Sequence, residues 1–264
     1  MTLFNPQFQI LSDIHLETPT LHPSYTFFSR SPTRFPLLAS NLLLLGDIGL
    51  VQHHALFSFL RYLLERTPNL RIFYVPGNHE AYGMPMDAAL SAMRTFEEHV
   101  RAEFGERFWF MDRQRVDVSP TLTILGCALW SRIDERQSEA CASALTDFHE
   151  TNGIRDRTVQ QHNADHARDL EWLNEQVGAI SASEGYRKII VLTHHSPTAD
   201  PRANDPVHAD SNVNSGFRTD LSKEACWTSL NVKLWAFGHT HFSCQYVDEE
   251  DGRKKLVVSN QKGY

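Results

Sequence analysis

The sequence lacks the features that mark several large classes of protein. Only four of its 264 residues are cysteine, and no two of them form a Cys-x-x-Cys pair, so neither a zinc knuckle nor a thioredoxin-type redox motif is present. Apolar runs such as residues 42–45 are far too short to cross a bilayer. The first six residues lack the basic stretch and the long apolar core of a secretory signal. These absences predict a cytoplasmic protein with reduced thiols and no membrane partner.

Positive charge is also scarce. The formal net charge is −7, and no stretch of five or more consecutive Lys and Arg occurs. Basic surfaces of that kind usually hold a nucleic-acid backbone, so the composition disfavours nucleic acid as a partner. An acidic chain that handles phosphates would instead recruit cations. With 41% hydrophobic residues, the chain can bury a substantial core.

Short apolar runs alternate with longer amphipathic stretches, as expected when strands are separated by helices. No internal repeat or low-complexity tract interrupts this order. The pattern predicts an α/β fold that forms a single domain over residues 1–264, because a boundary would split the polar clusters described below. Strands are predicted at residues 8–11, 42–45, 71–75, 122–125, 188–192, 232–237 and 255–259.

Three helices are predicted from apolar residues at three- and four-residue spacing. The first has its apolar face between residues 56 and 64 and ends before Pro68, because proline cannot continue a helix. The second begins with Asp87 as N-cap and ends at Gly105. The third covers residues 158–177 and ends at Gly178. Residues 196–216, rich in Pro, Asp, Asn and Ser, form one long irregular segment that could act as a lid.

Five short polar clusters each follow a predicted strand. In open α/β sheets the ligands bind at the carboxyl edge of the strands, so the clusters are expected to gather there. Carboxylates, neutral imidazoles and carbonyl oxygens are the side-chain groups that bind hard and intermediate metal ions. The clusters are Asp13 with His15, Gly46 with Asp47, residues 77–80, residues 193–195, and His239 with His241.

Local chemistry around these clusters favours a cation. Asp47 follows four leucines, so its charge would be costly at a buried strand end unless a cation compensates it. Gly77 permits the tight turn that presents Asn78 and His79. Two cations roughly 3.5 to 4 Å apart can stabilise both the attacking and the leaving oxygen of an in-line displacement. Imidazole and oxygen ligands without thiolate suit Mn, Fe, Zn or Co.

The order Asp-x-His, Gly-Asp, Gly-Asn-His-Glu, His and Gly-His-x-His resembles the calcineurin-like metallophosphoesterase superfamily, from Asp13 to His241. The resemblance implies a four-layer α/β/β/α sandwich of two mixed sheets flanked by helices, with the active site at the carboxyl edge of the strands. It also implies two metal ions, with Mn favoured, and hydrolysis of a small phosphodiester or phosphomonoester by a metal-bridging hydroxide. Residues 215–221 and 260–264 resemble segments of a small branch of the same superfamily, and both are expected to be scaffold.

The same resemblance implies a role for each polar residue. His79 matches the catalytic histidine, which contacts the phosphate or protonates the leaving oxygen, and Asp13 is the acidic group expected to orient it. Asp47 is expected to bridge the two metals. The other expected ligands are Asp13, His15 and His241 for one metal, and Asn78, His194 and His239 for the other.

Other histidines carry weaker signals. His162 and His166 lie four apart on a predicted helix, but no Glu completes a zincin motif, so both are expected to be solvated. His195 adjoins His194, and it either faces the substrate or has a structural role. His149 could reach the pocket, although nothing in the sequence fixes its position. The histidines expected to be ordinary surface residues are His22, His53, His54, His99 and His208.

The sequence narrows the substrate only partly. Protein serine/threonine phosphatases carry phosphate-clamping arginines after Gly-Asp and before Gly-Asn-His, and residues 48–51 and 75–76 offer none. Lipid-A precursor hydrolases usually have Arg where this chain has His79. Cyclic-nucleotide phosphodiesterases share the full motif order, so they stay an alternative, as does a non-catalytic scaffold that binds a partner. The loop arginines considered for substrate selection are Arg30, Arg34, Arg202 and Arg218.

Overall fold

The computed structural model describes residues 7–250 and 252–263, so the first six residues, where no secretory signal is predicted, and Tyr264 lie outside it. One sheet has the order β1 (Phe8–Leu11), β2 (Asn41–Leu45), β3 (Arg71–Val75) and β4 (Phe108–Phe110). The other has the order β5 (Gln114–Ser119), β6 (Leu122–Gly126), β7 (Lys188–Leu192), β8 (Val232–Phe237), β10 (Arg253–Ser259) and β9 (Cys244–Glu250).

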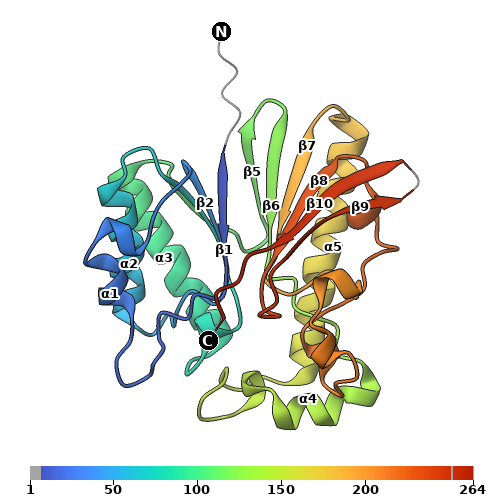
Figure 1. Cartoon of the computed structure of the whole chain (residues 1–264), viewed down its shortest axis with the longest axis horizontal. Helices are drawn as coiled ribbons and strands as arrows, with labels where there is room; N and C mark the ends of the chain where they lie inside the picture. The colour runs from blue at the N-terminus through green and yellow to red at the C-terminus, as the bar shows by residue number, and fades with distance from the viewer. Residues whose placement is uncertain (1–6, 251, 264) are drawn as a thin grey trace.

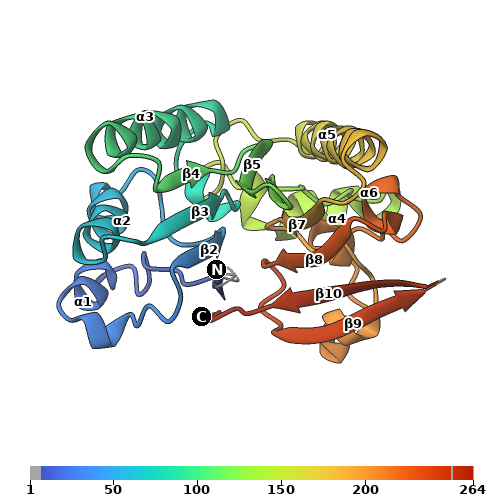
Figure 2. The same cartoon turned by 90° about the horizontal axis from the view of Figure 1, so that it is seen from above.

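The two sheets pack face to face, with helices on their outer faces (Figures 1 and 2). Helices α1 (Tyr25–Ser29), α2 (His54–Arg66) and α3 (Met86–Phe104) pack on the first sheet, and α5 (Val159–Ser183) and α6 (Ala225–Thr228) on the second. Between the sheets lies an apolar layer that includes Leu43, Phe73 and Leu192. The expected four-layer sandwich is therefore confirmed. One detail differs, because the first sheet is parallel throughout rather than mixed.

All seven predicted strands are present, because each is a short apolar run: β1 is half-buried along its length, and the other six contain buried positions. The prediction missed β4, β5 and β9. The first of these has only three residues, and the other two are antiparallel strands at opposite edges of the second sheet, with mostly exposed or half-buried side chains. Edge strands bury little apolar surface, so they leave a weak pattern in the sequence.

The three predicted helices correspond to α2, α3 and α5, with corrections at the ends. Helix α3 begins two residues earlier than expected, with Pro85 rather than Asp87 at its N-cap. Thr158 caps α5 through a capping box with Gln161, but the helix continues past Gly178 to Ser183. A Cβ on Gly178 would meet no atom within 4 Å, so this glycine sits on an open helix surface and does not end the helix. The short helix α4 (Ser138–Ala144), below the second sheet in Figure 1, was not predicted.

The expectation that His162 and His166 are solvated is wrong. Both lie on α5 with exposed fractions of 0% and 4%. Helix α5 packs its polar face on the loop after β6, where Nε2 of His162 lies 3.1 Å from the Ser131 hydroxyl and Nδ1 of His166 bonds to the Trp130 carbonyl oxygen. Burial lowers the pKa of both imidazoles, so both are neutral groups of the core.

Residues 196–216 form a folded loop rather than an extended one. Three 3-10 turns, Pro201–Ala203, Pro206–His208 and Asn214–Gly216, lie along it. The side chains of Asp200 and Asp205 cap the first two turns by accepting from the backbone N–H of Arg202 and Val207. This loop lies against the carboxyl edge of the second sheet, where Ser196 pairs with Arg218.

Candidate metal centre

Five of the seven predicted ligands occupy strained backbone at the ends of the strands. Asp13, His15, Asp47, His239 and His241 have φ angles of 52°, 52°, 54°, 70° and 50°. A left-handed conformation costs a non-glycine residue roughly 1–2 kcal/mol. Such residues cluster at functional sites, where the surrounding structure holds them in place. Five strained residues in three separate loops therefore mark this edge independently of the motifs.

The loops also approach one another very closely. Gly46 has a φ of 83°, and a Cβ there would lie 2.8 Å from the Cα of Gly77 and would collide with the ring of His194. A glycine is therefore required at this position to let three polar clusters meet. The contact explains why Gly46 precedes Asp47 in the sequence.

The first group of ligand atoms comes from Asp13, His15 and His241, whose donor atoms lie within 4.8 Å of one another. Nε2 of His15 lies 3.1 Å from Nε2 of His241, which in turn lies 3.4 Å from Oδ1 of Asp13. Nδ1 of His15 faces the Glu17 carboxylate at 3.0 Å, so this nitrogen carries the proton and Nε2 is left with its lone pair. Both oxygens of Asp13 accept from the backbone N–H of His239 at 3.1 Å.

The second group comes from Asn78, His194 and His239. Nε2 of His194 lies 2.9 Å from Oδ1 of Asn78 and 3.1 Å from Nδ1 of His239. The other ring nitrogen of each histidine faces a backbone carbonyl oxygen. Nδ1 of His194 lies 2.8 Å from that of Leu45, and Nε2 of His239 lies 3.4 Å from that of Gly216. These partners fix both tautomers so that the lone pairs point at one another, an arrangement that only a proton or a cation can stabilise.

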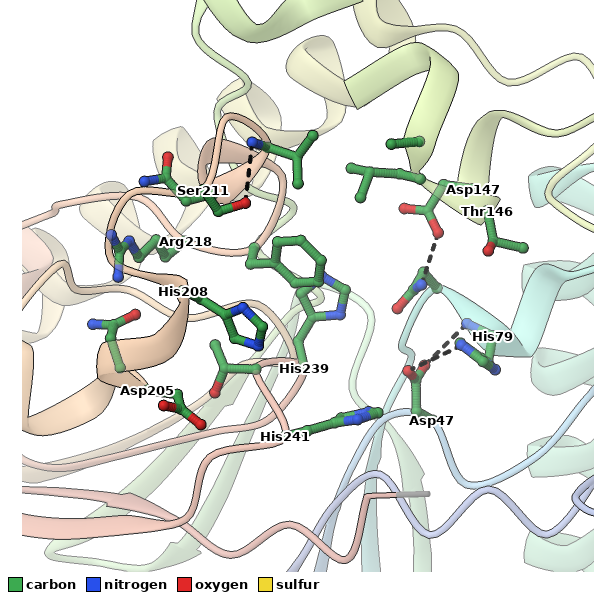
Figure 3. A pocket seen from close by; sticks show the side chains of 18 of the residues that line it. Asp47, His79, Thr146, Asp147, Asp205, His208, Ser211, Arg218, His239 and His241 are labelled. Atoms are coloured by element: carbon green, nitrogen blue, oxygen red, sulfur yellow. Dashed lines mark hydrogen bonds and ion pairs between the residues drawn. The ribbon is translucent and has the colours of Figure 1, made fainter. Parts of the chain in front are cut away.

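Asp47 joins the two groups, because its carboxylate lies close to Asp13 of the first and to His194 of the second, and it faces His79 at the cavity (Figure 3). Its Oδ1 accepts from the His79 backbone N–H at 2.9 Å and lies 3.4 Å from Nε2 of His194. One carboxylate oxygen of Asp47 lies within 4.8 Å of a carboxylate oxygen of Asp13 and of a ring nitrogen of His194. Burial lowers the pKa of His194, but the charge and the hydrogen bond of Asp47, with the charge of Asp13 and the hydrogen bond to Leu45, together raise it to about 10. A cation would compete with that proton, so metal binding here would release protons.

His79 stands beside the ligands with its ring at the pocket. Its Nδ1 faces Oε1 of Glu17 at 2.9 Å, and its Nε2 lies 3.8 Å from Oδ2 of Asp47. Burial lowers the pKa of His79, but the charge of Asp47 and the hydrogen bond to Glu17 raise it to about 9. Burial likewise raises the pKa of Glu17, and the two histidines lower it by more, to about 2. Glu17 is therefore ionised and is placed to orient the His79 ring, while the orienting role predicted for Asp13 stays a prediction.

Glu80 is a second acid whose role the sequence analysis missed. It is 2% exposed and accepts four hydrogen bonds, from the backbone N–H groups of Asp47, Ile48 and Gly77 and from the Tyr74 hydroxyl. These bonds join the loop that carries Asp47 to the loop that carries Asn78. The carboxylate adjoins His79 in the Gly-Asn-His-Glu motif, so the signal was present, but only the fold reveals its partners.

The two residues considered for substrate binding lie in different places. Arg218 lines a cavity of about 470 Å³ that opens over Asp47, His79 and His241. His195 is fully buried instead, with its ring 3.9 Å from that of His239, so its position supports packing rather than substrate contact. Its ring nitrogens have no hydrogen-bond partner within the described residues, and one of them lies within 4.8 Å of donor atoms of His194 and His239.

Other loop residues also require correction. His208 was expected to be an ordinary surface residue, but it lines the cavity together with Asn204 and Asp205 from the same loop (Figure 3). His149 does not line it, because its Nε2 bonds to the Ser143 carbonyl oxygen at 3.1 Å. The other loop arginines lie elsewhere as well: Arg202 pairs with Asp200, and Arg34 stacks on Phe27.

Comparison with known proteins identifies the family of the chain. The family model for calcineurin-like phosphoesterases matches residues 7–243, nearly the whole chain. This chain belongs to the calcineurin-like phosphoesterase family. An uncharacterised protein of Acanthamoeba polyphaga mimivirus is 25% identical over 274 residues, which cover 96% of this chain and 90% of the viral protein.

Solved structures support the calcineurin-like fold. The crystal structure of phosphopantetheinyl hydrolase from Mycobacterium tuberculosis aligns with a TM-score of 0.67 at 17% identity, covering 98% of this chain and 90% of that one. A second solved structure aligns with a TM-score of 0.52 at 12% identity. Among the described residues, no helix has the length and apolar character needed to span a membrane.

Proposed function

We propose that this chain is a dinuclear metal-dependent phosphoesterase that hydrolyses a small phosphodiester or phosphomonoester. One observation carries the proposal: two groups of buried imidazole, carboxylate and amide atoms converge on either side of Asp47, under an open cavity. Asp13, His15 and His241 would hold one ion, and Asn78, His194 and His239 the other. Asp47 would be shared between them.

The donor atoms fit metal ions. Nε2 of His15 and Nε2 of His241 face each other at 3.1 Å, and the protonated side of His15 already faces Glu17. Two ring nitrogens at that distance need a proton or a cation between them, and a metal ion can take that place. With oxygen and nitrogen donors and no thiolate, the set suits Mn, Fe, Zn or Co. The family resemblance, rather than the donor set, favours Mn. When bound, such ions polarise a phosphoester and lower the pKa of a coordinated water.

The chain's own residues would supply orientation and a proton. His79, held by Glu17 and raised in pKa to about 9, is a cationic donor beside Asp47, so it would donate a hydrogen bond or a proton to the leaving oxygen. Arg218 would contact the phosphoryl group or the substrate from the opposite wall of the cavity. Glu17 would keep the His79 ring in place.

Removal of metal gives a direct test. Treatment with a chelator should abolish hydrolysis of chromogenic phosphodiesters and monoesters, and Mn²⁺ should restore it. Two sites filled at a free Mn²⁺ concentration of about 100 times Kd would stabilise the fold by about 5 kcal/mol. For a chain of this size that corresponds to roughly 10–20 °C in melting temperature, measurable by scanning calorimetry. Fewer than one metal per chain, with no hydrolysis of any phosphoester, would favour the alternative of a non-catalytic scaffold.

The role of His79 predicts a dependence on the leaving group. His79→Asn removes the proton donor and should reduce kcat about 10²–10⁴-fold for an alkyl phosphoester, but far less for a nitrophenyl ester, whose leaving oxygen needs no proton. His149→Asn is the matched control, because His149 is exposed and outside the cavity. Equal losses for both esters would show that His79 does not act as the acid.

The cavity wall suggests a second candidate for the substrate. Leu145, Val213 and Phe217 form an apolar side, and Asn204 and Asn214 add amides. A neutral, amide-bearing chain joined to a phosphodiester fits that lining, and the structurally similar hydrolase from Mycobacterium tuberculosis is named for a phosphopantetheinyl group. A panel with Mn²⁺ should therefore compare a phosphopantetheinyl diester with cyclic nucleotides, glycerophosphodiesters and nucleoside monophosphates. Faster hydrolysis of a cyclic nucleotide would instead support that alternative.

A further inference from the structure

Asp147 is a buried carboxylate that the proposed hydrolysis does not use. It lies in the 3-10 turn Thr146–Phe148, between α4 and α5, and it is 3% exposed. Its Oδ1 accepts from Nδ2 of Asn78 at 2.7 Å and from the Tyr82 hydroxyl at 2.6 Å. Nδ2 of Asn78 also donates to the Tyr82 hydroxyl at 2.8 Å, which closes a triangle of three side chains.

This triangle can form with only one orientation of the Asn78 amide. An asparagine amide has one acceptor oxygen and two donor hydrogens on nitrogen. Tyr82 gives its only proton to Asp147, so both groups accept from Asn78 and neither can donate to it. The nitrogen of Asn78 must therefore face Asp147, and its oxygen must face Nε2 of His194 at 2.9 Å.

The loop that carries Asp147 is docked against the Asn78 turn. The backbone carbonyl of Asp147 accepts from the N–H of Ile154 at 3.1 Å. The backbone carbonyl of Gly153 accepts from the N–H of Gly83, which follows the Asn78 turn, at 2.8 Å. A Cβ on Gly153 would collide with the Thr146 carbonyl, so this glycine allows the tight return of the chain. The backbone thus holds the Asp147 carboxylate at a fixed distance from Asn78.

We propose that Asp147 is a positioning residue that turns the oxygen of Asn78 towards the second metal position. A flipped amide would present its NH₂ group to the cation, which is repulsive and would remove a ligand. The inference rests on the proposed function only in requiring a bound cation. The test of this proposal therefore measures the affinity for the metal ion and not the rate of hydrolysis.

Calorimetric titration of the metal-free 264-residue chain with Mn²⁺ tests the proposal. Outer-shell partners of ligands typically contribute 10–100-fold to metal affinity. Asp147→Ala should weaken one of the two Mn²⁺ sites by about that factor and leave the other nearly unchanged. Asp147→Asn keeps an acceptor oxygen and should restore part of the affinity. Tyr82→Phe should cost less than Asp147→Ala, because the carboxylate still accepts from Asn78.

A double-mutant cycle separates positioning from general structural support. In an Asn78→Ala background the ligand is gone, so adding Asp147→Ala should not weaken Mn²⁺ binding further. Asp169→Asn is the matched control: Asp169 is 1% exposed and accepts from Arg113 and from the N–H of Leu129, so its loss should lower the melting temperature without changing Mn²⁺ affinity.

Three outcomes would overturn the proposal. The first is an unchanged Mn²⁺ affinity in Asp147→Ala. The second is a loss of Mn²⁺ affinity on adding Asp147→Ala to the Asn78→Ala chain that equals the loss in the wild-type chain. The third is an effect of Asp147→Ala on KM alone, which would make Asp147 a substrate contact. A wild-type chain that binds two Mn²⁺ ions but hydrolyses nothing would defeat the proposed phosphoesterase alone. A wild-type chain that binds no divalent metal would defeat both.

Discussion

Asp47→Asn should abolish hydrolysis, and adding Mn²⁺ should not restore it. Asp47 lies between the two groups of ligand atoms, so the substitution removes a negative charge from both metal positions at once. Loss of one electrostatic contact to a transition state already costs about 10²–10³-fold in kcat, so a shared carboxylate should cost at least about 10³-fold. Initial rates for a chromogenic diester and metal content by elemental analysis measure the two effects.

The matched control for Asp47→Asn is Asp117→Asn. Asp117 lies on the edge strand β5 and pairs with Arg115 at the surface, so the same chemical change there should leave rate and metal content unchanged. The backbone N–H of His79 donates to Asp47, and an asparagine oxygen can still accept that bond, so the fold should persist. Full activity of the Asp47→Asn chain would contradict the dinuclear mechanism.

The ligand loops could be predicted because each signal is local. A short apolar strand followed by a polar pair places the pair at the sheet edge whatever the rest of the chain does. Asp47 after its four leucines is the clearest case, since burial of its charge already required a partner. The left-handed backbone of Asp13, His15 and His241 could not be predicted, because strain there is imposed by the packing of distant loops.

Residues that act through long-range contacts were missed or misplaced. Glu17 is two residues beyond His15, but its contact with His79 joins positions 62 apart in the chain. Asp147 belongs to a loop without periodicity, and its partner Asn78 is 69 residues away. His162 and His166 looked solvated because their helix neighbours are polar, and only the docking of α5 on the loop after β6 buries them. Such contacts depend on tertiary packing and leave no local pattern.

Glu80→Ala should have the largest effect on stability. It would remove one acceptor group from four buried donors, which are the N–H groups of Asp47, Ile48 and Gly77 and the hydroxyl of Tyr74. Each buried donor left unpaired costs about 1–3 kcal/mol, so loss of all four bonds should cost about 4 kcal/mol or more. Urea unfolding of the metal-free chain measures the change in the free energy of unfolding.

Glu80→Gln tests whether the negative charge of Glu80 matters for stability, because glutamine has nearly the same shape without the charge. Burial and the Asp47 charge raise the pKa of Glu80, while the Tyr74 hydroxyl and the Ile48 N–H lower it. Each oxygen already accepts two hydrogen bonds, so no lone pair is free for a proton and the carboxylate should be ionised. The glutamine NH₂ would then face donors, at a cost of about 2–4 kcal/mol.

Glu97→Gln provides the comparison for Glu80→Gln. Glu97 is half-buried and accepts one backbone N–H, from Phe110, so its substitution should cost about 1 kcal/mol or less. If Glu80→Gln cost no more than that, Glu80 would be a neutral acid in the folded chain, and the loops of Asp47 and Asn78 would be joined without its charge. If it costs several times more, an ionised carboxylate holds the two loops together before any metal binds.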